Sequence, residues 1–481
     1  MKKISLSLLL LAGAQIIDAD PTKCASHVFV PRSISTDLVY VNSLSYYRRH
    51  HQDKEKTDIY TGTLFCQNSF KSKQMGAAFL LSDSNTVTVA QDAPADINSA
   101  FLGLSQSNQS APFFSRFTID PQRKVFGFHG NWYFTLDNWW CGLWLDISAA
   151  IVNVRHTLNC LEIGNFSNEI PGILTVADAL ANPAFKFGKF FCGLCNDEKR
   201  RTGIDDIQLR LGYNYTWCEN NILGVYLIGT IPTGRKPTAE FVFEPLVGSR
   251  HGSIGIGLLA EYNFDWCGCD EESNLALLTD FNYRFVFSHN ECRTFDLMPN
   301  GAFSRFLPVA LQTDPSVPFS GINFFTKRVN VQPRSTIQWW LALNFEHCDW
   351  DLEIGYNLFW RQKERIKAST ITAPAPTLGI FDLGCVGLAC TSASTATIGS
   401  FDIVPDTTFI PLTAAHLNVK SAVAGRALTN KIYIAGSLDG CWCNCISWFC
   451  GIGASYELVA NHDKCNALRY WAVFSKAGIS F

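Results

Sequence analysis

Hydrophobic and polar residues alternate with a period of two along much of the chain. In residues 205–217 (DDIQLRLGYNYTW), every second side chain from Ile207 to Trp217 is apolar, and the positions between them include Gln208 and Arg210. This period is typical of β-strands that present one apolar and one polar face. The same pattern recurs in residues 251–264, 275–287, 335–347 and 351–361.

The length of these segments indicates which kind of β-protein they form. They run for about 10 to 14 residues, whereas strands of globular proteins average roughly five or six. A strand that crosses a bilayer at a tilt needs about 9 to 11 residues, and aromatic residues near the segment ends match a membrane interface. A β-sandwich would also alternate, but it would not need this length. We therefore predict an all-β fold, a transmembrane antiparallel β-barrel, because a sheet in hydrocarbon must close on itself.

The segments between the predicted strands are alternately short and long. Outer-membrane barrels have short periplasmic turns and long extracellular loops. If the last strand runs inward, the short turns fall on the periplasmic side and the long loops outside, with residues 461–466 as one short outside loop. The short turns, rich in Trp and Cys, are 138–142, 217–221, 266–273, 347–351 and 439–447, and the long loops are about 158–203, 232–250, 289–334 and 363–429.

Counting these segments predicts about 14 strands, within a range of 12 to 16. Eleven strands follow residue 124 or so, and residues 57–69, 74–82 and 113–119 supply three more. We assign residues 57–481 to the barrel and residues 20–56 to a periplasmic lead-in or a plug. The loop 158–203 contains an apolar spacing (Ile173, Val176, Ala177 and Leu180) that predicts a short amphipathic helix, either folded into the pore or packed on the rim.

The first 19 residues have the parts of a secretory signal peptide. Lys2 and Lys3 precede an apolar stretch from Ile4 to Ala14, and Ala19 ends a possible cleavage site. A buried N-terminal helix would not explain the paired lysines. The sequence thus predicts an exported protein whose signal peptide spans residues 1–19.

Composition and motifs narrow the function. Only 17% of residues are charged and the net charge is −3, so we expect no nucleic-acid partner. Residues 229–237 (GTIPTGRKP) resemble a phosphate loop but lack its Lys-Ser/Thr ending. Glu346 and Glu353 could be an acid pair, yet lining a lumen explains them better. We predict neither an enzyme nor a cofactor.

The chain has 18 cysteines, all downstream of the predicted signal peptide. Cys192 and Cys195 have half of a zinc spacing, but no second pair follows at the required distance, and a redox C-x-x-C would need a βαβ setting. We therefore predict no metal site and predict disulfides, within or between chains. Because most close-set cysteines lie on the short turns, cross-linking on that side is favoured. The disulfide candidates are Cys192, Cys195, Cys267, Cys269, Cys441, Cys443, Cys445 and Cys450.

The chain ends on an alternating strand with a terminal aromatic residue, RYWAVFSKAGISF. This ending, the signal peptide and the long strands resemble Gram-negative outer-membrane β-barrels over about residues 124–481. The resemblance implies that Phe481 is the signal read by the barrel assembly machinery. Two groups are more similar: the cysteine-rich major outer-membrane porins of chlamydiae, and the 14-stranded uptake barrels for fatty acids and hydrocarbons, which residues 209–215 and 224–237 resemble.

From these observations we predict a porin-like channel of the outer membrane for passive diffusion of small hydrophilic solutes. The alternatives are a cysteine-cross-linked structural envelope protein, a hydrophobic-ligand uptake barrel and an adhesin. The expected partners are outer-membrane lipid, the assembly machinery, and a homo-oligomer or disulfide-linked envelope proteins. The predicted pore-lining residues are Asp206, Gln208, Arg210, Glu261, Asp280, Asn282, Arg284, Glu346, Glu353, Arg361 and Lys476. An inward-facing Phe474 does not fit this polar lining.

Overall fold

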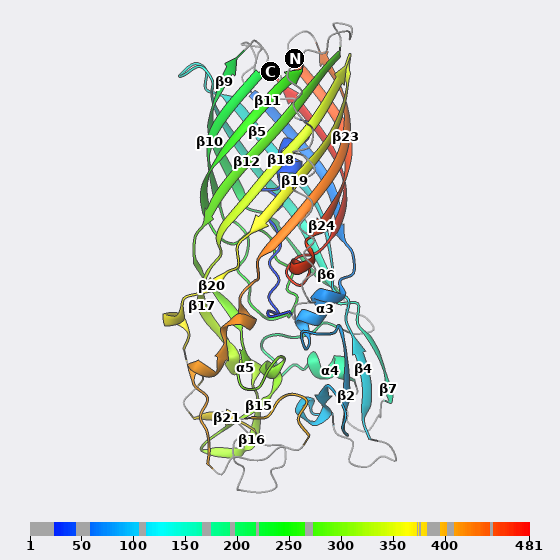
Figure 1. Cartoon of the computed structure of the whole chain (residues 1–481), viewed down its shortest axis with the longest axis vertical. Coiled ribbons are helices and arrows are strands. Elements are labelled where there is room, and N and C mark those ends of the chain that lie inside the picture. The colour runs from blue at the N-terminus through cyan, green and yellow to red at the C-terminus, as the bar shows by residue number, and fades with distance from the viewer. Residues whose placement is uncertain are drawn as a thin grey trace, which may run out of the picture.

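A computed structural model describes residues 24–44, 58–104, 112–165, 175–192, 198–217, 221–264, 273–372, 374, 377–381, 395–401, 408–442 and 446–481. The predicted signal peptide lies outside these residues. Within them, twelve antiparallel strands close into a barrel, since β5 pairs with both β1 and β6 (Figure 1). In ring order the strands are β5 (Gln122–Thr135), β1 (Asp58–Ser69), β25 (Tyr470–Ser480), β24 (Ile446–Val459), β23 (Ala427–Trp442), β19 (Trp350–Arg361), β18 (Arg334–His347), β12 (Ser273–Val286), β11 (Ser253–Phe264), β10 (Asn221–Ile231), β9 (Ile207–Trp217) and β6 (Leu143–Thr157).

The barrel prediction is confirmed, and the twelve barrel strands of the described chain lie at the lower limit of the predicted range of 12 to 16, two fewer than the expected 14. Residues 74–82 contain a helix, α3 (Lys73–Phe79), capped by the Ser72 hydroxyl, which accepts from the Met75 amide. Five consecutive residues of α3, from Met75 to Phe79, are buried, so this run lacks the alternation of a lipid-facing strand. Residues 113–119 do form a strand, β4 (Phe114–Thr118), but it pairs with β2 and β7 outside the barrel.

An additional strand, β8 (Glu198–Ile204), precedes β9, and both strands pair with β6. It pairs with β6 from Ile151 to Thr157, whereas β9 pairs with β6 from Leu143 to Ser148. Asp205 and Asp206 separate the two strands, and both are buried. The strand predicted at residues 205–217 is thus β9, and β8 lies in the segment that the sequence analysis assigned to the long loop 158–203.

The strand ends that flank the short connections lie at one end of the barrel, and those that flank the long connections lie at the other (Figure 1). We call these the short-turn end and the loop end. The predicted alternation of connections is thus confirmed, and the C-terminus lies at the short-turn end. The strands alternate buried and exposed side chains along their length, as in β24 and β25.

The outer face of the barrel is a continuous apolar band. Exposed apolar side chains cover its middle: Leu64, Phe126, Ile151, Leu211, Leu223, Leu227, Ile256, Leu258, Leu343, Ile354, Ile432, Ile434, Ile452 and Val473. Exposed aromatic rings lie near the short-turn ends of the strands: Tyr60, Tyr215, Tyr262, Phe264, Trp350, Trp442 and Phe481. This arrangement is typical of a barrel surrounded by lipid.

The long loops pack into a small folded region at the loop end (Figure 1). Its strands are β2 (Thr86–Ala90), β3 (Ile97–Asn98), β4, β7 (Leu161–Asn165), β13 (His289–Thr294), β14 (Asp296–Leu297), β15 (Pro308–Leu311), β16 (Asp314–Ser320), β17 (Thr326–Gln332), β20 (Arg365–Ile366), β21 (Leu378–Ile380) and β22 (Leu417–Asn418). Its short helices are α3, α4 (Val176–Leu180) and α5 (Ile322–Phe325), with 3₁₀ turns at 99–102, 304–306, 368–370, 414–416, 419–422 and 461–463. One aromatic core joins them, including Phe79, Phe117, Phe190, Phe303, Phe306 and Phe325.

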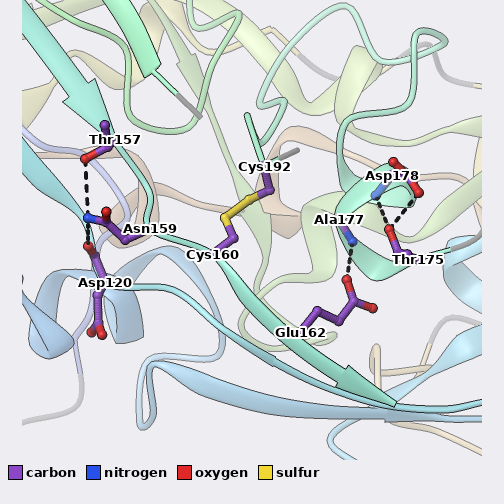
Figure 2. Close-up of a disulfide and its surroundings, with 9 residues drawn as sticks. All are labelled: Asp120, Thr157, Asn159, Cys160, Glu162, Thr175, Ala177, Asp178 and Cys192. Carbon is purple, nitrogen blue, oxygen red and sulfur yellow. Dashed lines mark hydrogen bonds between the residues drawn. A yellow bond between two sulfur atoms is a disulfide. The ribbon is translucent and has the colours of Figure 1, made fainter. Parts of the chain in front are cut away.

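The predicted amphipathic helix in loop 158–203 is α4, and its surroundings show how this loop is held. The Glu162 carboxylate accepts from the amides of Val176 (2.8 Å) and Ala177 (3.1 Å) at the start of the helix. A disulfide joins Cys160 to Cys192, on either side of α4 in the chain (Figure 2). The carboxylate and the disulfide therefore fix both ends of the loop that carries the helix.

The terminal Phe481 lies where the first and last strands meet. Its amide donates to the Asp58 carbonyl (3.2 Å), the Asp58 amide donates back (3.3 Å), and its ring stacks on Tyr60 with centroids 5.8 Å apart. A strand that closes a barrel cannot fray without exposing unpaired backbone groups. The side chain of Phe481 contributes directly to this seam.

Deleting Phe481 is expected to lower the amount of folded barrel in the membrane several-fold, while the conductance of each folded barrel stays unchanged. Heat-modifiable migration of membrane fractions measures the folded amount. Phe285→Ala, which removes an equally exposed ring from the outer face at the loop end, is the matched control. Wild-type levels of the truncated barrel would show that Phe481 does not act in assembly.

Candidate functional site in the closed lumen

The interior of the barrel is occupied by the chain's own N-terminal part. Residues 24–44, here called the lumen segment, run through the barrel as the dark blue trace in Figure 1. At the loop end Cys24 forms a disulfide with Cys465. At the other end of the segment the Leu44 amide donates to the Glu353 carboxylate of β19 (3.0 Å). From Ser33 to Leu44 every residue is buried.

One helical turn, α1 (Leu38–Asn42), lies inside the barrel. Its sequence, LVYVN, includes two valines and is a weak helix former by itself. Asp37 caps it by accepting from the Val39 amide (3.1 Å). The Lys476 ammonium of β25 donates to the carbonyls of Tyr40 (3.2 Å), Val41 (3.1 Å) and Ser43 (2.7 Å). The barrel wall thus satisfies carbonyls that a helix end leaves without partners.

Buried ion pairs join the lumen segment to the wall. Asp37 forms a pair with Lys431 of β23 and a second with Arg32 (3.2 Å). Lys431 also lies 3.4 Å from the Glu457 carboxylate. Asp37 is the only carboxylate between residues 24 and 44. Because an uncompensated buried charge is costly, breaking such a pair destabilises by roughly 3–5 kcal/mol.

A second polar group surrounds Asn42 nearer the short-turn end. The Asn42 amide donates to Asp280 (2.8 Å), and Arg210 bridges Asp280 (3.5 Å) to Asp146 (2.8 Å). The Tyr226 hydroxyl also donates to Asp280. These contacts connect α1 to β6, β9, β10 and β12, so the segment is held by several strands.

The predicted pore-lining residues face the barrel interior, and ten of the eleven are buried. Six contact the lumen segment directly: Arg210, Asp280, Arg284, Glu353, Arg361 and Lys476. Asp206 accepts from the Ser249 amide (2.6 Å), Gln208 donates to Ser148 (3.5 Å), and Asn282 accepts from Arg284 (3.0 Å). Glu261 is buried, and Glu346 is half-buried near the short-turn end. The polar face is the surface on which the lumen segment packs.

The inward Phe474 now has a physical reason. Its ring packs edge-to-face on Tyr40 of the lumen segment, with centroids 5.8 Å apart, and Tyr40 stacks on Phe65 at 4.7 Å. On the neighbouring strand, a Cβ at Gly453 would lie 2.4 Å from the Phe474 ring, so this glycine makes room for it. The exception to the alternating pattern was the signal of an apolar occupant in the lumen.

Sequence reasoning missed several residues that hold the segment: Arg32, Asp37, Asp146, Tyr226, Lys431 and Tyr433. Tyr433 donates to Glu353 (2.6 Å), and its ring covers Gly355 of β19, where a Cβ would lie 2.3 Å away. Large rings opposite glycines on the polar face were a sequence signal for a filled barrel. No comparable pattern marks Asp37, because its partner Lys431 is 394 positions away.

The cysteine predictions have mixed outcomes. Cys192 is bonded, with Cys160, and Cys24 with Cys465, so both described disulfides lie toward the loop end. Cys441 and Cys450 are exposed and form no disulfide within the described residues, so for these two a bond to another chain stays the open alternative. Cys195, Cys267, Cys269, Cys443 and Cys445 lie outside those residues. Cross-linking to another molecule stays a prediction.

At the loop end a cavity of about 80 Å³ lies against the lumen segment. We call it the mouth cavity. Its walls are largely apolar and include Phe29, Pro237, Phe241, Phe243 and Leu246, and the charged residues Glu244, Arg250, Arg293 and Arg305 also line it. Arg250 and Arg293 are both paired with Glu291, at 3.1 and 2.7 Å. Burial raises the pKa of Glu291, but the Arg250 and Arg293 guanidiniums outweigh it and hold this pKa well below its usual range.

His27 lines the mouth cavity and is neutral in the folded protein. Burial, reinforced by Arg305, lowers its pKa to about 3, although Asp296 opposes this shift. An unfolded histidine has a pKa of about 6.5, so unfolding takes up a proton below that pH. The stability contributed by neutral His27 is therefore present above pH 6.5 and is lost as the pH falls toward 3.

We expect the free energy of unfolding to fall on the order of 2 kcal/mol more between pH 7 and pH 5 in the wild type than in His27→Gln, at 1.36 kcal/mol per pKa unit. Urea unfolding at the two pH values measures the difference. His462→Gln, which changes a histidine outside the cavity, is the control. Equal pH dependence in wild type and His27→Gln would contradict this account of His27.

Metal-binding clusters and bilayer-spanning helices are both absent from the described residues. No group of three or more His, Cys, Asp or Glu side chains there has the geometry to hold a metal ion. None of the helices in that part of the chain has the length and hydropathy needed to cross a bilayer.

Fold and site together define a β-barrel closed by its own N-terminal segment. No family model and no curated protein matches the sequence. Similar solved structures include an outer-membrane channel from Pseudomonas putida F1 (11% identity, 89% of this chain and 98% of that one, TM-score 0.36), a Pseudomonas aeruginosa FadL homologue (7%, 90% and 92%, 0.28) and the Pseudomonas putida toluene transporter TodX (7%, 96% and 97%, 0.29). These scores are too low to support an inference about this chain, whose fold rests on its own strand pairing. The resemblance to chlamydial porins stays a prediction.

Proposed function

We propose that the chain is an outer-membrane channel for small, largely apolar molecules, and that the lumen segment closes it at rest. The observation that carries this proposal is the filled lumen: residues 24–44 are bonded to both ends of the barrel and to its walls. A solute can cross only if this segment moves. The proposal adopts the uptake alternative of the sequence analysis in place of an open hydrophilic pore.

The outer surface supports a membrane location. A barrel with an apolar band and an aromatic border is stable in lipid and would aggregate in water. We assign the short-turn end to the periplasm and the loop end to the outside, as the sequence predicts. Outer-membrane lipid and the barrel assembly machinery are the partners this location requires.

The mouth cavity supports the class of solute. Its lining contains Phe29, Phe241 and Phe243, and aromatic and aliphatic walls favour apolar ligands. Because Phe29 belongs to the lumen segment, a molecule bound there touches the part of the chain that closes the channel. The Arg250 and Arg293 side chains of this cavity are already paired with Glu291, so they offer less to a hydrophilic solute.

The test compares solute entry in porin-deficient Gram-negative cells with and without the protein. We expect it to raise naphthalene uptake several-fold and to leave sucrose uptake unchanged. Phe241→Ala, which removes a half-buried ring from the mouth cavity, should lower naphthalene uptake several-fold, whereas Phe285→Ala on the outer face should not. Equal increases in sucrose and naphthalene would indicate an open pore, and no increase in either would reject a channel.

A second candidate function is a structural one in the envelope. Cys141 and Cys441 are exposed thiols at the short-turn end, each beside an exposed tryptophan. This placement favours disulfides to a neighbouring envelope protein or to a second copy. Non-reducing gels of cells alkylated before lysis distinguish the two: high-mass species that collapse on reduction would support cross-linking, and a monomer alone would argue against it.

A further inference from the structure

A second cavity lies between the lumen segment and the barrel wall, and it is rich in arginine. We call it the arginine cavity; its volume is about 70 Å³. The lumen segment contributes Val30, Pro31, Arg32, Ser33 and Thr36 to its lining. From the wall come Arg284 of β12 and Arg361 of β19, together with the hydroxyl residues Thr230, Ser249, Ser253 and Thr336.

Neither wall arginine has a carboxylate partner within the described residues. Arg284 is 3% exposed and donates to the Asn282 side chain (3.0 Å) and the Thr36 carbonyl (3.4 Å). Arg361 is 5% exposed and donates to the carbonyls of Val30 (2.7 Å) and Gly425 (3.3 Å). The hydrogen bonds of both guanidiniums thus go to neutral acceptors.

The other charged groups of the cavity are already engaged. Arg32 pairs with Asp37 at 3.2 Å. Glu364, the one carboxylate among the described lining residues, pairs with Arg293 (3.1 Å) and accepts from the Ala424 amide (2.8 Å). His251 lies 3.1 Å from Glu291. None of these groups lies within ion-pair distance of Arg284 or Arg361 in the described residues; the Glu364 carboxylate acts on Arg361 only at longer range.

Burying two guanidiniums without an anion is energetically unfavourable, since arginine keeps its charge in proteins. Carbonyl dipoles offset only part of the lost hydration. In addition, the Arg361 Nε and the Thr230 hydroxyl are buried without a hydrogen-bond partner. The lining therefore has more hydrogen-bond donors and more positive charge than its acceptors and carboxylates can satisfy. The cavity itself leaves room for a small ligand beside these donors.

We propose that the arginine cavity binds a small oxyanion, with its oxygens accepting from Arg284 and Arg361. Guanidinium groups match carboxylate, phosphate and sulfate oxygens in a two-bond geometry. The anion can be the carboxylate of a small organic solute, for which Val30, Pro31 and Phe359 offer apolar contact, or an inorganic ion. Because Val30 and Thr36 of the lumen segment are bonded to the same two arginines, the bound anion competes with the segment for them.

Equilibrium dialysis of the full-length barrel in detergent, with radiolabelled benzoate, acetate and phosphate at constant ionic strength, tests the proposal. We expect saturable binding of at least one of these anions, at least tenfold weaker in Arg284→Met and in Arg361→Met. Arg426→Met, which removes an exposed arginine at the loop end, should bind like the wild type. Preference for benzoate over acetate would identify an organic solute as the source, and preference for phosphate an inorganic ion.

Melting of the wild-type barrel provides a readout that does not depend on the variants folding. The anion that binds should raise the midpoint of unfolding relative to chloride at equal ionic strength. Absence of binding and of this shift for all three anions would overturn the site, as would binding that both arginine variants retain. Binding is measured without transport, so this outcome is separate from the uptake test of the proposed channel.

Discussion

Deleting residues 24–44 should convert a barrel that passes almost no ions into one with a steady open conductance. Eight strands leave an interior filled by side chains, whereas 16 to 18 leave an aqueous channel. A ring of twelve strands lies between them, and here the interior holds an additional stretch of chain with its own helical turn. Without that stretch, buried wall residues such as Lys431, Lys476 and Glu353 would face water.

Single-channel recording in planar bilayers measures this change, and we expect at least a tenfold rise in mean conductance. The deletion also leaves Cys465 without its partner, so Cys24→Ser/Cys465→Ser is the control that keeps the segment and loses the disulfide. That control should stay mostly closed, because the contacts of Asp37, Asn42 and Leu44 remain. A truncated barrel that is folded by heat-modifiable migration but still closed would contradict the role of the segment as the closure.

Asp37→Asn is the single substitution expected to have the largest effect on closure. It removes the only carboxylate of the lumen segment and leaves Arg32 without its anion, while Lys431 keeps Glu457 at 3.4 Å. The asparagine can still cap α1, so the loss is one of charge. A destabilisation of about 3 kcal/mol, at the lower end for a broken buried pair, would raise the ratio of open to closed states roughly 100-fold.

The measurement is the open fraction in long single-channel records, with the free energy of unfolding followed in parallel. Asp463→Asn is the matched control, because it neutralises a buried carboxylate that pairs with Arg426 at the loop end, outside the lumen. It should leave the open fraction unchanged. If Asp37→Asn gates like the wild type, the ion pairs with Lys431 and Arg32 do not hold the segment in place.

Most of the barrel strands could be predicted from the sequence because the alternation of apolar and polar residues is visible within each strand separately. The two faces of residues 253–264 or 350–361 are set by lipid on one side and the interior on the other, so the period of two is visible without any partner strand. The loop region was harder to predict. The run from Met75 to Phe79 could be a strand or a helix by composition, and its burial in an aromatic core made it a helix. β4 has a strand pattern, but pairing alone decides which sheet it joins.

For the candidate site, too, the sequence predicted which residues face the lumen but did not predict what they contact. The lumen-facing positions of Arg210, Asp280 and Lys476 followed from alternation, and the structure places them inside. What they contact did not follow, because the lumen segment has no periodic pattern and its partners are hundreds of residues away in sequence. The alternation showed that Phe474 is an apolar residue on the polar face. Only the folded structure shows that its ring packs against Tyr40 of the lumen segment.

The alternation along the chain is enough to predict a barrel with two different faces and with short and long connections at opposite ends, because each side chain responds locally to lipid, lumen or water. That the lumen holds residues 24–44 could be learned only from the folded chain. The position of this irregular N-terminal segment is set by long-range contacts such as Asp37 with Lys431 and Cys24 with Cys465. The residues that make these contacts are far apart in the sequence and follow no periodic pattern. The position of the lumen segment therefore cannot be predicted from the sequence pattern alone.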